Sequence, residues 1–95
     1  MATKSITITV RGGTITAEPN NGNVFDGHPN DKIEWKSNVP FAIGFVDLSG
    51  GGLVLSGTAV SPQAFELDLR VPRGTFFKYT VIADNLVLDP YIGVT

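Results

Sequence analysis

The chain of 95 residues contains no cysteine. Disulfide bonds, thiolate metal ligands and cysteine nucleophiles are therefore excluded. Because disulfides mark oxidising compartments, their absence leaves the compartment undetermined. The printed sequence suits a cytoplasmic protein, and a removed leader would make it periplasmic or secreted.

The chain also has few charges and no excess of basic residues. Charged residues make up 17% of the sequence, and 7 Lys and Arg against 9 Asp and Glu give a net charge of −2. Affinity for nucleic acid comes mostly from clustered lysine and arginine, which neutralise phosphates and release counterions. The seven cations are scattered along this chain, so we expect no nucleic-acid partner.

Long hydrophobic runs are absent as well. No segment approaches the roughly 18 consecutive apolar residues of a membrane helix, so we expect no membrane span. Hydrophobic residues nevertheless make up 42% of the chain, which is ordinary for a globular protein. A chain of this length forms one core, and we expect a single domain over residues 1–95.

What is present is an alternation of apolar and polar residues with a period of two. It runs through "KSITITV", "DKIEWKS", "AFELDLRV" and "TFFKYTVIA", and 11 glycines and 6 prolines separate such segments. Period-two segments bounded by turn residues are typical of half-buried strands. We therefore predict an all-β fold, a two-sheet Greek-key β-sandwich of seven or eight strands with antiparallel or mixed pairing.

Three segments resemble the cupredoxins, the family with the blue-copper fold. "NDKIEWKSNVPFAIGF" resembles their "GDxVxWxN" strand and the following turn, and "GTFFKYTV" is similar to their penultimate strand, "GxYxYxC". "LVLDPYIGVT" resembles their closing "GMxGxIxV" strand, and its "LDP" resembles bacterial cupredoxin-like proteins that lack metal ligands. The resemblance covers roughly the whole chain and implies a cupredoxin-like sandwich.

The resemblance also implies that the copper site is missing. Blue-copper members bind the metal with two histidines, one cysteine and a weak axial methionine. Carried over by position, the first histidine falls at Phe41, the cysteine at Val81, the second histidine near Asp84 and the methionine near Leu88. None of these is the required ligand, so we expect no copper, no other cofactor and no electron transfer. Phe41 and Val81 would fill the volume of the ion with hydrocarbon.

Any ligand or partner contact that persists at this end would be made by the residues around the lost site. These are Phe41 and Leu88, which are apolar, and Asp84 and Asn85, which are polar loop residues. The alternative is purely structural: Asp84 and Asn85 form a hairpin turn, and Asp89-Pro90 is a kink in the last strand.

A second metal hypothesis rests on His28, the single histidine, which lies in "FDGHPND" between Asp26 and Asp31. One histidine is short of the two or three typical of catalytic zinc, and the aspartates are not spaced as in a calcium loop. A solvated loop is therefore favoured over a metal site.

Catalytic motifs are not found. The serines lie outside any "GxSxG" elbow, and Gly50-Gly51-Gly52 is followed by "LVL" rather than by the lysine and Ser or Thr of a phosphate-binding loop. Glu66 and Asp68 lie on the same face of one strand, and two neighbouring acids of this kind are typical of a solvent-exposed surface rather than a catalytic cleft. We therefore do not expect an enzyme.

Two further patterns bear on binding. Trp35, Tyr79 and Tyr91 would offer sugars a stacking surface, although Trp35 alternates with charges and is expected to pack inside. Outward residues of two strands would form an exposed apolar stripe that favours docking or self-association; they are Ala42, Gly44, Val46, Phe76 and Ile82.

The expected function is therefore that of a metal-free binding or interaction module. Its partner would be a protein or small ligand, with a homo-oligomer as one possibility. The alternatives are a metal-binding protein that uses His28 and nearby carboxylates, and a small carbohydrate-binding module.

Overall fold

The computed structural model describes residues 2–48, 57–61 and 63–95. These residues form ten strands and one short 3-10 turn, η1 (Asn20–Gly22). The strands are β1 (Thr3–Arg11), β2 (Thr14–Glu18), β3 (Val24–Gly27), β4 (Lys32–Ser37), β5 (Phe41–Asp47), β6 (Gly57–Ser61), β7 (Ala64–Asp68), β8 (Phe76–Ala83), β9 (Leu86–Leu88) and β10 (Tyr91–Val94).

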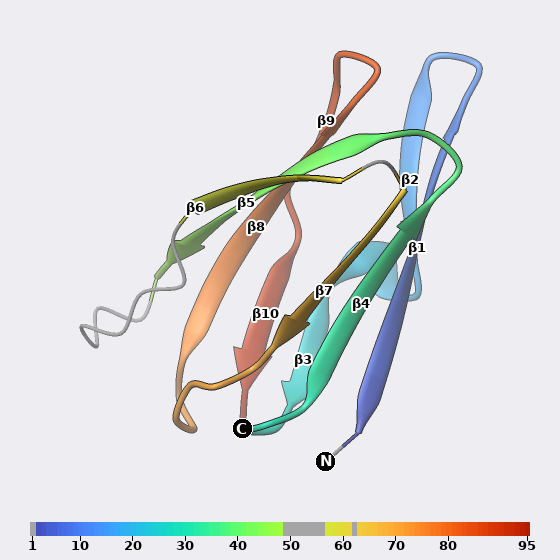
Figure 1. The fold of residues 1–95 in the computed structure, drawn as a ribbon. Coiled ribbons are helices and arrows are strands. Elements are labelled where there is room, and N and C mark those ends of the chain that lie inside the picture. The colour runs from blue at the N-terminus through green and yellow to red at the C-terminus, as the bar shows by residue number, and fades with distance from the viewer. Residues whose placement is uncertain (1, 49–56, 62) are drawn as a thin grey trace.

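The strands form two mixed sheets that face each other, and the predicted all-β sandwich is confirmed (Figure 1). The four-stranded sheet has the order β2-β1-β4-β7. The six-stranded sheet has the order β3-β10-β8-β5-β6, and β9 also pairs with β8. The pairs β1–β4 and β10–β3 are parallel, whereas the other pairs are antiparallel.

The strand number exceeds the seven or eight expected, for identifiable reasons. The polar, glycine-bearing composition of residues 20–30 is typical of a loop, yet this segment contains β3, which pairs with β10. The glycine-rich section at residues 47–63 contains β6, which pairs with β5. By composition, Leu53, Val54 and Leu55 of the same section can form only a short strand, and they lie outside the described residues.

The closing strand is divided at Asp89-Pro90, as the structural alternative predicts. β9 pairs Leu88 with Val81, and β10 continues the same antiparallel register by pairing Tyr91 with Lys78. The ladder is interrupted where proline has no N–H to donate, although the Pro90 carbonyl still accepts from the Tyr79 N–H at 3.0 Å.

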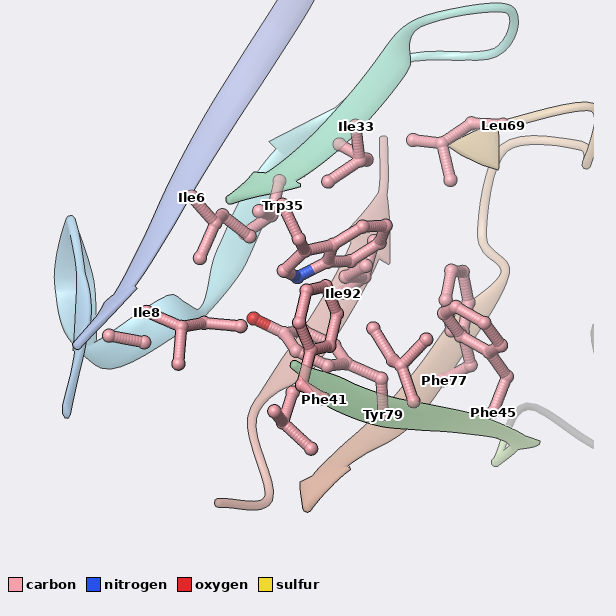
Figure 2. Packing of buried hydrophobic residues seen from close by; sticks show 14 of the residues in the cluster. Ile6, Ile8, Ile33, Trp35, Phe41, Phe45, Leu69, Phe77, Tyr79 and Ile92 are labelled. Carbon is pink, nitrogen blue, oxygen red and sulfur yellow. The ribbon is translucent and has the colours of Figure 1, made fainter. Parts of the chain in front are cut away.

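The core lies between the sheets and centres on Trp35 of β4, which is fully buried (Figure 2). Its indole ring packs edge-on against Tyr79 at 5.1 Å and Phe45 at 5.9 Å between centroids, both from the six-stranded sheet. The Trp35 prediction is therefore confirmed. The period-two pattern explains this arrangement, because alternate residues of each strand face the opposite sheet.

Tyr79 connects the core to the 3-10 turn. Its hydroxyl donates a hydrogen bond to the carbonyl of Gly22, and burial raises the pKa of Tyr79 above its ordinary value. Gly22 has a φ of +85°, and a Cβ atom there would lie 2.7 Å from that hydroxyl and 3.1 Å from Ala17 Cβ. Only glycine therefore meets both the backbone and the packing requirement at this position.

We predict that Gly22→Ala destabilises the fold by about 2–4 kcal/mol, because left-handed strain adds to overpacking. The matched control is Gly74→Ala, since Gly74 has a φ of +88° but a Cβ atom added there would meet nothing within 4 Å. This control should cost only about 1 kcal/mol. Urea denaturation measures both; equal losses would show that the contact with Tyr79 contributes nothing.

Candidate functional site

The positions that the cupredoxin resemblance assigns to the metal are filled by the core. Phe41 opens β5 and Val81 lies in β8, and both are buried on the inward side of the six-stranded sheet. Leu88 is half-buried, packs against the same apolar cluster and pairs with Val81. Hydrocarbon therefore occupies these three positions.

The two polar residues assigned to the same end lie at the tip of a hairpin. Ala83 pairs with Leu86, so Asp84 and Asn85 form a two-residue turn between β8 and β9. Both residues are exposed and have positive φ, +51° and +63°, as a tight hairpin of this kind requires. The structural interpretation of this pair is confirmed. Contact with a ligand by Phe41, Asp84, Asn85 and Leu88 stays a prediction.

The residues of the second metal hypothesis contact distant segments of the chain, at the end of the sandwich opposite to the Asp84-Asn85 turn. Asp31 is buried, and its two carboxylate oxygens accept hydrogen bonds from the backbone N–H groups of Ala2 and His28, at 2.9 and 3.0 Å. His28 Nδ1 lies 3.2 Å from the carbonyl oxygen of Thr95, and Asp26 lies 3.4 Å from Lys4 Nζ. In the part of the chain that the structure describes, no three His, Cys, Asp or Glu residues group as metal ligands do.

The environment of Asp31 favours its ionised form. The hydrogen bond from the Ala2 N–H lowers the pKa of Asp31, burial opposes that effect, and the His28 N–H lowers the pKa further. Because the folded-state pKa lies below its value in the unfolded chain, this carboxylate stabilises the fold above that unfolded value. The contribution is lost as pH falls through the folded-state pKa.

We predict that Asp31→Asn lowers the free energy of unfolding at pH 7 by about 1.5–3 kcal/mol, the range for hydrogen bonds to a charged group. The difference between wild type and variant should begin to shrink as pH falls below about 4, the ordinary pKa of Asp in the unfolded chain, and should vanish as pH falls through the lower folded-state pKa. Urea denaturation at several pH values measures it. A difference independent of pH would contradict this role of the charge.

Two of the three aromatic residues of the sugar-stacking alternative lie in the core. Trp35 and Tyr79 are fully buried. Tyr91 is exposed on β10, where its ring stacks on Phe76 at 5.5 Å with an interplanar angle of 9°. Of the three, Tyr91 alone is therefore available to a ligand.

The exposed large hydrophobic side chains gather on one face of the molecule. Among the residues whose side chains the structure describes, which are 2–46, 48 and 63–95, there are seven of them, and all belong to strands of the six-stranded sheet or directly follow one. We call this set the apolar face: Phe25, Val46, Leu48, Phe76, Ile82, Val87 and Tyr91.

Strand register explains why these side chains share one face. Ile82 of β8 pairs with Val87 of β9 on one side and with Ala42 of β5 on the other. Paired residues in neighbouring strands point to the same side of a sheet, so this row points outward together. Val87 is 55% exposed and Ile82 is 48% exposed, so this row presents apolar side chains to solvent on both β9 and β8.

The expected apolar stripe is part of this face. Phe76, Ile82 and Val46 are exposed there, and Ala42 and Gly44 are half-buried between them. The sequence pattern missed Phe25, Leu48 and Val87. In "LVL" at residues 86–88 every residue is apolar, so alternation alone does not indicate which of the three faces outward.

A small polar group lies in the middle of the apolar face. Lys78 pairs with Val46 and Tyr91, and its Nζ lies 3.9 Å from Asp89 Oδ2. The other oxygen of Asp89 accepts a hydrogen bond from the Thr80 hydroxyl at 2.7 Å. The face therefore has one cation and one anion between two apolar ends.

The outer face of the four-stranded sheet is polar. Hydroxyl and charged side chains line a shallow depression on β1 and β2: Thr7, Thr9, Arg11, Thr14, Thr16 and Glu18. On β4 and β7, Lys32 lies 3.4 Å from Glu66. The two outer faces of the sandwich thus differ in character, and only that of the six-stranded sheet exposes large apolar side chains among the described residues.

Comparison with known proteins finds neither a family model nor a curated protein that matches the chain. In residues 2–48, 57–61 and 63–95, no helix has the length and hydropathy needed to cross a membrane.

Proposed function

We propose that this chain is a metal-free, cupredoxin-like interaction module that binds a protein partner through its apolar face. The observation that carries this proposal is the confinement of the seven exposed large hydrophobic side chains of the described residues to one outer face. Single exposed apolar residues are normal on any protein, whereas large apolar side chains gathered on one face mark an interaction surface.

The extent of the apolar face suits a macromolecular partner. β8 has eight residues, so at about 3.3 Å per residue it is about 26 Å long. Four neighbouring strands at a spacing of about 4.8 Å span about 19 Å, which gives a face of about 500 Å². Small-molecule sites are concave, whereas this surface is the open side of a sheet.

The buried positions support the metal-free part of the proposal. Phe41, Val81 and Leu88 belong to or pack against the apolar core, and Asp31 already accepts two backbone hydrogen bonds. Hydrocarbon offers an ion no donor atom, and both oxygens of Asp31 already bind the backbone. The family assignment rests on the three quoted motifs and on the sandwich architecture that agrees with them.

We predict that protein purified without chelator contains no stoichiometric transition metal, as measured by elemental analysis of the purified chain. His28→Ala should leave the metal content unchanged, because His28 contacts Thr95 rather than two further ligands. A metal bound at one per chain and lost in His28→Ala would instead favour the metal-binding alternative.

Site-specific photo-crosslinking in cells tests the interaction itself. With a benzophenone amino acid at position 82, on the apolar face, we expect discrete covalent adducts. The same group at position 7, which is also exposed but lies on the polar sheet, is the matched control and should yield none. Identical adduct patterns from both positions, or none from position 82, would contradict the proposal.

A further inference from the structure

We propose that the partner of the apolar face is a second copy of this chain, packed face to face about a two-fold axis that passes near Lys78 and Asp89. This inference rests on the proposed function, in that it takes the apolar face to be a binding surface. It adds the identity of the partner and the geometry of the contact.

The charges of the face are complementary to themselves. In a two-fold interface the same patch is used on both subunits, so if residue i contacts residue j, then j contacts i. With an axis between them, Lys78 of one copy lies against Asp89 of the other, and the reverse pair forms at the same time. Lys78 and Asp89 of one chain already lie 3.9 Å apart, so two copies bring two such pairs together as a closed, neutral group of four charges.

The distribution of apolar side chains fits the same axis. Ile82 and Val87 lie at one end of the face, and the stacked pair Phe76 and Tyr91 lies at the other. A two-fold rotation about the centre places the aliphatic end of one copy on the aromatic end of its partner. Gly44 pairs with Thr80 and has no side chain. The surface is therefore lower at this point near the axis, which lets the two sheets approach.

The size and the net charge agree with a weak, reversible dimer. Two faces of about 500 Å² each bury about 1,000 Å², near the lower limit for specific interfaces. The net charge of −2 per chain gives only slight repulsion between copies. We therefore expect a dissociation constant in the micromolar range or weaker.

Sedimentation equilibrium over a wide concentration range is the first test. The average mass should rise from 10.1 kDa toward twice that value as concentration increases. Ile82→Glu should weaken association at least about tenfold, because it buries an unpaired charge in the interface. Thr7→Glu, which adds the same charge to the polar sheet, should leave association within about twofold.

A charge exchange tests the axis itself. Lys78→Glu and Asp89→Lys each place like charges together across the interface, so each alone should associate at least about tenfold more weakly. Mixing the two variants in equal amounts should restore a heterodimer to within about threefold of wild type, because Glu at position 78 then faces Lys at position 89 and Asp89 faces Lys78. Urea denaturation of each variant checks that the fold is intact.

The outcomes separate the two proposals. A chain that stays monomeric at millimolar concentration, together with adducts from position 82 to other proteins, overturns the second copy and leaves the interaction module standing. Monomer without such adducts overturns both. Association that is unaffected by Ile82→Glu, or that is not restored in the mixture, overturns the two-fold geometry.

Discussion

Trp35 packs edge-on against Tyr79 and Phe45 across the space between the sheets, and the rest of the structure depends on this contact. Once alternate residues of β8 and β5 are committed to the core, the residues between them must face outward. The apolar face is therefore formed by the outward residues of the same strands whose inward residues form the core. The same strands that bury Tyr79 and Phe45 expose Ile82 and Val46.

The outward residues of β5 and β8 distinguish the two sheets, because β5 is apolar on both sides and β8 exposes Phe76 and Ile82. A strand of an ordinary sandwich has one apolar face and one polar face, and β1 follows that rule with its threonines outward. β5 instead resembles a strand that is covered on both sides, and the outer side of β8 is apolar at both ends. In the isolated chain their outer side is exposed, which is the physical basis for proposing a partner there.

Under the proposed cupredoxin-like assignment, hydrocarbon side chains lie at the positions of the metal ligands. Phe41 and Val81 contribute buried apolar surface at an end that blue-copper members devote to an ion. Stability then depends on packing and on backbone contacts such as those of Asp31, which join Ala2 to the loop of His28.

Local sequence alone was enough to establish the strand class, the buried position of Trp35 and the impossibility of a copper-thiolate centre. Each follows from local composition: alternation of apolar and polar residues, and the complete lack of cysteine. The existence of β3, the outward direction of Val87 and the meeting of Lys78 with Asp89 on one surface emerge only in three dimensions. These depend on register between distant strands, and shifting a strand by one residue would turn every side chain to the opposite face.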